Sequence, residues 1–418
     1  MPTETQLSSA DLMRLEDTYG AHNYHPMPVV LARGKGCKVW DVEGKEYYDF
    51  LSAYSAVNQG HCHPRLIEVV KRQVETLTLT SRAFYSNLLG LYEEKITKLF
   101  GFDKVLPMNS GAEGVETALK LARRWGYAKK RIPPEKAKIV VFDGNFHGRT
   151  ITIVSFSTDP SSRDGYGPYT PGFITVPYNN IPELEKAMKD AQICALLVEP
   201  IQGEAGVMVP DDGFLRACRT ICDKNEALLI ADEIQTGLSR TGKMLACDHE
   251  NVKPDMLILG KALSGGMYPV SAVLADDDVM LTIKPGEHGS TYGGNPLACA
   301  LAMEALDILI EDKLAENAER MGKVVRDGLS AIKSPLISTI RGKGLLNAIV
   351  IEPFTIKGER KTAWDVCVAL KDAGLLAKPT HDHIIRLAPP LVITEAQVKD
   401  CLKIIRGVIE GFEAKRDR

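Results

Sequence analysis

Long apolar runs are missing from this sequence of 418 residues. A helix that spans a membrane needs about 20 consecutive apolar residues, and no stretch approaches that length, so we expect no membrane partner. The first twenty residues, MPTETQLSSADLMRLEDTYG, lack the apolar core of a secretory signal peptide. Their acidic side chains and scarce arginine are unlike a mitochondrial presequence. We therefore expect a cytoplasmic protein, or one of the mitochondrial matrix if a presequence precedes this chain.

A strong charge of either sign is also missing. The net charge is −3 and no basic stripe stands out, so nucleic acid is not an expected partner. The nine cysteines are odd in number and scattered, which indicates reduced thiols. The His-Cys-His run at 61–63 has no second group of ligands, so we expect no metal site. Hydrophobic residues at 44% and charged residues at 25% are ordinary for a globular enzyme.

Short apolar runs alternate with amphipathic helical patterns from about residue 104 to residue 275. Strands that alternate with helices imply right-handed crossovers and a mostly parallel sheet. The runs are apolar throughout, as expected for strands that are covered on both faces. The expected strands span 138–142, 173–178, 194–200, 227–233 and 256–260.

The pattern changes at both ends of this α/β region. Residues 1–60 contain a hairpin pattern, CKVWDVEGKEYYDFL, with Glu43-Gly44 at its turn, and we expect this segment to pack with a smaller domain. From Asn295 a long helical stretch begins, followed by strand patterns and more helix. We therefore expect a large α/β domain over 61–295 and a small α+β domain over 296–418.

Ligands of an open parallel sheet bind beyond the carboxyl ends of its strands. Polar and aromatic side chains follow four of the expected strands at this position. They are Asn145, Phe146, His147 and Arg149, then Glu199 and Glu204, then Asp232 and Gln235, and finally Lys261. In addition, Ser110-Gly111-Ala112 opens a long amphipathic helix, and small residues at a helix start suit a phosphate.

These residue types together suit pyridoxal 5′-phosphate, which has a phosphate, an aromatic face, a basic ring nitrogen and an aldehyde. Lys261 would form the Schiff base, and its small neighbours would leave room for cofactor and substrate. Asp232 would pair with the pyridine nitrogen, and Phe146 would stack on the ring. Each residue alone has a simpler interpretation: Lys261 as a solvated charge, Asp232 as a helix cap, and SGAEG as an ordinary turn.

The motifs taken in order carry more information than any one residue. NSGAEGVETALKLAR, GNFHGRT, VEPIQGEAG, IADEIQTGLSRTG, LGKALSGG and GSTYGGNPLA resemble the class III aminotransferases of the fold-type I family that depends on pyridoxal phosphate. The resemblance runs from about Tyr24 to Pro390. It implies a large domain with a mostly parallel sheet flanked by helices, plus a smaller α+β domain.

The resemblance also implies roles for individual residues. Lys261 matches the Schiff-base lysine, Asp232 the pyridine partner, Gln235 the ligand of the ring hydroxyl and Phe146 the stacking aromatic. Ser110, Gly111 and Ala112 match the phosphate cradle. Ser290 and Thr291 match phosphate ligands that come from the neighbouring subunit, which implies a homodimer.

Within the family the chain is most similar to members that act on ornithine. Tyr24, Tyr54, Arg149, Glu204 and Arg386 match their substrate-binding set. This implies ping-pong transfer of the δ-amino group of L-ornithine to 2-oxoglutarate, which gives glutamate 5-semialdehyde and L-glutamate. N-acetylornithine or 4-aminobutyrate are alternative substrates, and Tyr24 and Tyr54 argue against both. A non-catalytic binding protein is a further alternative, but it would be expected to have lost Lys261 or Asp232.

The chain departs from the ornithine-specific pattern at two places. His147 stands where some of these members have tryptophan, and the segment EPFTIKGERKTAWD is longer than expected. We expect neither departure to touch the contacts of the cofactor ring.

Overall fold

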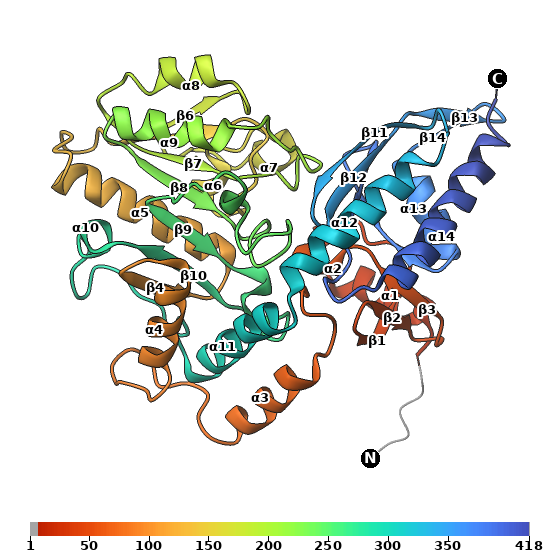
Figure 1. The fold of residues 1–418 in the computed structure, drawn as a ribbon, viewed down its shortest axis with the longest axis horizontal. Helices are drawn as coiled ribbons and strands as arrows, with labels where there is room; N and C mark the ends of the chain where they lie inside the picture. Colours follow the sequence, from red (N-terminus) through yellow and green to blue (C-terminus); the bar gives the residue numbers. More distant parts are fainter. Residues whose placement is uncertain (1–6, 418) are drawn as a thin grey trace.

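The computed structural model describes residues 7–417 of the chain. Its helices and strands form two groups, which lie side by side in Figure 1. The larger group is built around a seven-stranded sheet with strand order β4-β10-β9-β8-β7-β5-β6. The strands are β4 (Lys104–Met108), β5 (Lys138–Phe142), β6 (Phe173–Val176), β7 (Ile193–Val198), β8 (Leu228–Asp232), β9 (Met256–Leu259) and β10 (Ser271–Ala275).

The expected mostly parallel sheet is confirmed: one of the five expected strands, 138–142, matches β5 at both ends, and the other four differ from the observed strands by one or two residues at their ends. Strands β4 and β10 were not expected, and β10 runs antiparallel between β4 and β9. The connection between β9 and β10 explains the direction of β10. It is too short for the crossover of a dozen or more residues that a parallel strand needs.

Helices cover both faces of this sheet, because successive strand residues point to opposite faces. Ile139, Ile230 and Ile258 face one side and pack against α5 (Gly111–Ala128). On the other side, β5, β7 and β8 pack against α8 (Ile181–Ala187) and α9 (Phe214–Lys224). There β9 and β10 pack against α3 (Pro64–Val74), α4 (Leu89–Phe100) and α11 (Pro296–Glu311). Shorter helices are α2 (Ser52–Ser55), α6 (Ile151–Val154), α7 (Pro160–Arg163) and α10 (Asp277–Met280).

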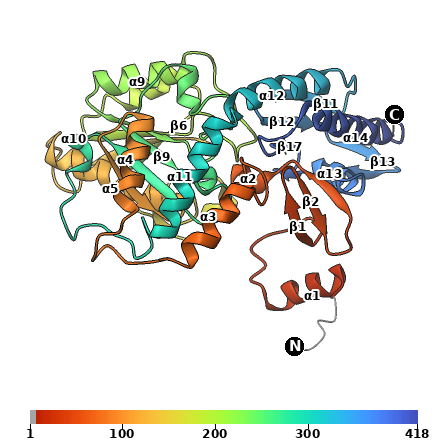
Figure 2. The ribbon, with the colours of Figure 1, turned by 60° about the horizontal axis from the view of Figure 1, so that its bottom comes forward.

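The second group joins the two ends of the chain. One sheet has the order β1-β2-β3-β15, and its strands are β1 (Leu31–Lys35), β2 (Lys38–Asp41), β3 (Glu46–Asp49) and β15 (Leu375–Leu376). Strands β2 and β3 form an antiparallel hairpin, and β3 pairs in parallel with β15. Figure 2 shows α1 (Ser9–Tyr19) beside this hairpin, where the Ser9 amide donates to Glu43 Oε1 at 2.9 Å.

A second small sheet has the order β11-β12-β17-β16. Its strands are β11 (Ile337–Lys343), β12 (Leu346–Ile351), β16 (Lys378–Thr380) and β17 (Ile384–Leu387). The helices of this group are α12 (Leu314–Ser330), α13 (Ala363–Asp372) and α14 (Glu395–Glu413). The long segment EPFTIKGERKTAWD contains the hairpin of β13 (Phe354–Ile356) and β14 (Glu359–Lys361) and the start of α13.

The helical stretch after Asn295 is two helices, where the sequence pattern indicated one. The break falls at Lys313, whose φ of 50° is left-handed and ends the regular helix. Helix α11 lies on the large sheet and α12 continues to the smaller group, as Figure 1 shows. Because of this break, α11 packs on the large sheet while α12 packs in the second group of elements.

Arg240 ties the two groups together from a fully buried position. Its Nη1 donates to the carbonyl oxygens of Leu345 at 3.0 Å and Pro389 at 2.7 Å, and its Nη2 donates to Asn58 Oδ1 at 2.5 Å. Burial lowers the pKa of Arg240 to about 9. Because no carboxylate pairs with it among residues 7–417, these neutral acceptors carry the whole contact.

We predict that Arg240→Met lowers thermal stability. The change leaves three buried acceptors without their donor, and one such loss costs about 1–3 kcal/mol. The measurement is the melting temperature, compared with that of Arg406→Met, which removes an exposed arginine of α14. Equal melting temperatures for the two variants would show that Arg240 does not hold the groups together.

Candidate active site

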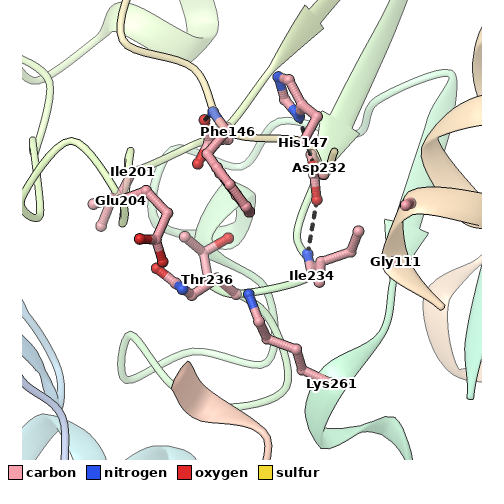
Figure 3. Close-up of a pocket in the computed structure, with 13 residues that line it drawn as sticks. Gly111, Phe146, His147, Ile201, Glu204, Asp232, Ile234, Thr236 and Lys261 are labelled. Carbon is pink, nitrogen blue, oxygen red and sulfur yellow. Dashed lines mark hydrogen bonds and ion pairs between the residues drawn. The ribbon is translucent and has the colours of Figure 1, made fainter. Parts of the chain in front are cut away.

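The candidate site lies at one edge of the large sheet. Strands β5, β7, β8 and β9 are mutually parallel, so the residues that follow them gather at that edge. They surround a cavity of about 210 Å³, shown in Figure 3. The cavity is lined by Gly111, Ala112, Phe146, His147, Gly148, Glu199, Ile201, Glu204, Asp232, Ile234, Gln235, Thr236 and Lys261.

Lys261 points its amine into this cavity from the residue after Gly260 (Figure 3). It begins the 3₁₀ helix η2 (Lys261–Ser264) with a φ of 46°, an uncommon conformation for a residue with a side chain. Burial lowers the pKa of Lys261, and the nearby charge of Arg386 acts in the same direction. Glu204 and Asp232 oppose the shift without cancelling it. A larger fraction of neutral amine makes Lys261 a better nucleophile.

The small residues after Lys261 also allow close packing. Gly265 and Gly266 both have positive φ, and a Cβ on them would lie 2.3 Å from Leu66 Cδ1 and 2.4 Å from Val57 Cγ1. Gly266 and Ser264 also line a second cavity that contains Lys261. Gly265 and Gly266 are small because the turn after η2 packs closely against the N-terminal segment.

Asp232 and His147 form a buried pair at the back of the cavity. His147 Nδ1 lies 2.6 Å from Asp232 Oδ2, and the amide of Ile234 donates to Asp232 Oδ1 at 3.1 Å. Burial lowers the pKa of His147, but the hydrogen bond and the charges of Asp232 and Glu199 outweigh it and raise the pKa above its ordinary value. The expectation that His147 stands apart from the ring contacts was wrong, because His147 holds the carboxylate expected to meet the ring.

Glu199 supports the loop that presents Phe146. Its Oε1 accepts the Phe146 amide at 2.9 Å, which joins the residue after β7 to the loop after β5. Burial raises the pKa of Glu199 to about 7, despite the opposing charge of His147. The sequence placed Glu199 at a strand end, but its contact with Phe146 depends on strand order.

The start of α5 offers two free amides to the cavity. Glu113 accepts the amides of Asn109 at 2.9 Å and Ser110 at 2.8 Å, and the Ser110 hydroxyl caps the helix. The amides of Gly111 and Ala112 have no acceptor among residues 7–417. The positive end of an 18-residue helix and two free N–H groups suit a phosphate.

Gln235 presents another unfilled group. Its Oε1 is buried and has no donor among residues 7–417. A Cβ on Gly203 would lie 1.4 Å from this oxygen, so glycine is required beside it. A ligand with a hydroxyl donor would satisfy the amide oxygen.

Three residues of the expected substrate-binding set meet beside the cavity. Arg386 Nη1 donates to Glu204 Oε1 at 2.6 Å, and the Arg386 guanidinium lies 4.8 Å from the centre of the Tyr54 ring. Burial raises the pKa of Glu204, but the charge and hydrogen bond of Arg386 outweigh it and lower the pKa. Glu204 is therefore held as an anion on a buried arginine.

The other expected residues lie further from the cavity lining. The Arg149 guanidinium lies 5.8 Å from the centre of the Phe146 ring, and both Arg149 and Tyr24 are exposed. Ser290 Oγ accepts a hydrogen bond from Asn109 Nδ2 at 2.9 Å, beside the start of α5. Thr291 is exposed. Ser110 lines a second cavity that also contains Lys261, whereas Ser290 and Thr291 line neither of these two cavities.

Two further observations concern residues 7–417. They contain no cluster of three or more His, Cys, Asp or Glu side chains that could bind a metal ion. None of their helices has the length and apolar character that a membrane crossing requires.

Known proteins resemble this chain over nearly its whole length. The model of the family Aminotransferase class-III matches residues 19–409. The ornithine aminotransferase of Rattus norvegicus, named mitochondrial, is 62% identical over 97% of this chain and 91% of its own length. A structure of the ornithine aminotransferase from Toxoplasma gondii, described with partial occupancy of PLP, is 47% identical with a TM-score of 0.95, covering 98% of this chain and 96% of that one.

A crystal structure of acetylornithine aminotransferase from Elizabethkingia anophelis is 57% identical with a TM-score of 0.88, covering 97% of this chain and 100% of that one. The chain therefore belongs to the class III aminotransferase family, with the fold-type I architecture. Among its relatives, enzymes named for ornithine are 47% to 62% identical to it.

Proposed function

We propose that this protein transfers the δ-amino group of L-ornithine to 2-oxoglutarate, with pyridoxal phosphate as its cofactor. The observation that carries this proposal is the Glu204–Arg386 pair next to Lys261. While the pair is closed, Glu204 neutralises Arg386, and when the pair opens, Arg386 can bind a carboxylate. One pocket can therefore accept two differently charged substrates. The names of the rat and Toxoplasma gondii relatives support the same substrate.

The cavity residues fit this cofactor. The free amides of Gly111 and Ala112 would hold the phosphate, Phe146 would stack on the ring, and the unpaired Gln235 oxygen would accept from the ring hydroxyl. Asp232, held by His147, would pair with the ring nitrogen. When bound, pyridoxal phosphate supplies an aldehyde for the amine and a ring that accepts electrons from the broken C–H bond.

Ornithine has two amines, so its α end must be held away from Lys261. Arg149 would bind the α-carboxylate with two parallel hydrogen bonds, and the Tyr24 hydroxyl would accept from the α-ammonium. The δ-amine then lies at the Lys261 end of the pocket, where the freed Lys261 amine moves the proton of the δ-carbon. The products are glutamate 5-semialdehyde, which cyclises, and L-glutamate.

Glu204 would act as the switch between the two half-reactions. Arg386 is suited to the α-carboxylate of 2-oxoglutarate or glutamate, but during the ornithine half-reaction it would attract the wrong end of ornithine. Paired with Glu204, Arg386 is masked. A dicarboxylate that displaces Glu204 then gains a buried arginine that ornithine does not reach.

N-acetylornithine is the second candidate substrate, because the Elizabethkingia anophelis structure is named for it and is 57% identical. Acetylation removes the positive charge of the α-amine. A preference for the acetylated compound in a substrate panel would therefore indicate that Tyr24 does not recognise an ammonium group.

We also propose a homodimer. Large apolar side chains are exposed at Phe84, Tyr85, Leu91 and Tyr292, and Gly294, two residues after Tyr292, lies against Leu89, two residues before Leu91. Such a surface marks an interface. Ser290 and Thr291 lie at its edge and would complete the phosphate site of the partner subunit.

We propose a reducing compartment, either the cytoplasm or the mitochondrial matrix. All nine cysteines are free and eight of them are half or fully buried, while the rat relative is named mitochondrial.

The first prediction from this function concerns Lys261. The parent protein with pyridoxal phosphate should show a visible absorption band that changes when ornithine is added. Lys261→Ala should lack the normal band and have almost no turnover, because no other amine of residues 7–417 lines the cavity. Lys403→Ala, which alters an exposed lysine of α14, is the control. Near-normal turnover by Lys261→Ala would refute the assignment.

The second prediction concerns Glu204. In Glu204→Ala, Arg386 is unmasked throughout, so α-amines including glutamate should react better relative to the δ-amine of ornithine. Loss of a preference of about 1.4 kcal/mol changes the ratio of the two rates about tenfold. Both half-reactions are measured in single turnover, with Glu410→Ala, an exposed glutamate of α14, as control. An unchanged ratio would exclude Glu204 as the switch.

The third prediction concerns assembly. Sedimentation should show a dimer at the concentrations of the activity assay, and Tyr85→Glu should shift it toward monomers with lower activity, since a charge replaces a fully exposed aromatic ring of the proposed interface. A fully active monomer would contradict the dimer and the role of Ser290 and Thr291.

A further inference from the structure

Lys378 is a cation beside the substrate-binding residues that the proposed mechanism does not use. It lies on β16, directly opposite Arg386 in the antiparallel ladder, so both side chains leave the sheet on the same face. Its Nζ lies 5.7 Å from the centre of the Tyr24 ring. Lys378 therefore stands between two residues of the expected substrate-binding set.

The place of Tyr24 beside β16 is held by its neighbour. The His25 ring stacks on Trp364 of α13 at 4.4 Å between ring centres, with an angle of 11° between the planes. This contact attaches the N-terminal segment to the helix that precedes β15 and β16. Tyr24, Lys378 and Arg386 are thus brought together by packing within the second group of elements.

Lys378 is half-buried, and its side chain has no ion pair or hydrogen bond with any of residues 7–417. Burial lowers its pKa, the charge of Arg386 acts in the same direction, and Glu204 opposes both. Two cations, Arg386 and Lys378, therefore share one anion, Glu204. A partly buried cation without a partner is costly, and a second anion in this place would remove that cost.

The charges of Glu204, Arg386, Lys378 and the substrate show at which step a second anion enters this group. While Glu204 masks Arg386, the group carries one surplus positive charge. When the α-carboxylate of 2-oxoglutarate takes Arg386, Glu204 loses its partner, so this carboxylate and Glu204 are two anions at this end of the substrate. Lys261 compensates less than Lys378 would, because burial lowers the pKa of Lys261 and its neutral amine is needed for proton transfer. With Lys378 the open state has two cations for two anions, and without Lys378 it has one cation for two.

We propose that Lys378 is a specificity-determining residue, which supplies the second positive charge that lets the Glu204–Arg386 pair open for a dicarboxylate. This inference rests on the proposed function of the site. It assigns Lys378 to the 2-oxoglutarate half-reaction, because ornithine brings positive amines and is bound while the pair is closed.

The test compares Lys378→Met and Lys378→Gln with the parent in single-turnover reactions of the holoenzyme, with ornithine and with 2-oxoglutarate. We expect the ratio of apparent affinity for 2-oxoglutarate to that for ornithine to fall about tenfold in both variants. Lys378→Arg keeps the charge and should restore most of the ratio. Lys403→Met, an exposed lysine of α14, is the matched control.

An unchanged ratio in both neutral variants overturns the proposal, and so does an arginine variant as impaired as they are. A merely structural role would impair both half-reactions together and leave the ratio unchanged. A parent protein that does not react with ornithine at all would instead overturn the proposed function, so the two failures are distinguishable.

The same measurements in a Glu204→Gln background test the charge count. Without the displaced anion, Lys378→Met should change the ratio less than it does in the parent, which is the coupling that a double-mutant cycle measures. An undiminished effect would show that Lys378 acts independently of Glu204 and would overturn the proposed mechanism of opening.

Discussion

The buried guanidinium of Arg240 is the contact on which the arrangement of the site depends. Arg240 lies in the loop that follows β8, eight residues after Asp232, and it binds backbone carbonyls of the second group. Pro389 is one of these acceptors, and it lies three residues beyond Arg386. The same guanidinium therefore sets where Arg386 stands relative to Asp232 and Lys261. The acceptors of Arg240 are neutral. The contact therefore brings no carboxylate near the site that could compete with a substrate for Arg386 or Lys261.

Within that frame, the charges of the site influence one another because they share a region with little water. Glu204 remains an anion on Arg386, and Arg386 in turn helps to lower the pKa of Lys261. At the other end of the cavity, Asp232 stabilises the charged form of His147. Interactions of this kind weaken with solvent access, so a substrate that enters and displaces water strengthens them.

The sequence predicted those parts that depend on local pattern and chain order. Fully apolar strands identified the parallel sheet, and the residues after four of these strands do line one cavity. The antiparallel β10 and the break at Lys313 were missed, because neither disturbs the apolar pattern. His147 was misjudged for another reason. Its contact with Asp232 joins loops 85 positions apart, and no spacing within the GNFHGRT motif reveals it. The close packing of Gly265 and Gly266 against Leu66 and Val57 was not predicted, because these partners lie about 200 residues earlier in the chain.

The two ends of the candidate site come from different parts of the fold. Gly111, Asp232 and Lys261 belong to the large sheet, whereas Tyr54, Lys378 and Arg386 belong to the N-terminal segment and the small sheet. Glu204 comes from the large group, and its carboxylate accepts a hydrogen bond from Arg386 of the small sheet. Changes in the second group can therefore alter which amine or carboxylate is accepted while the end around Lys261 stays intact. Relatives of similar identity, 57% and 62%, carry the names of different substrates on one fold, which a division of this kind permits.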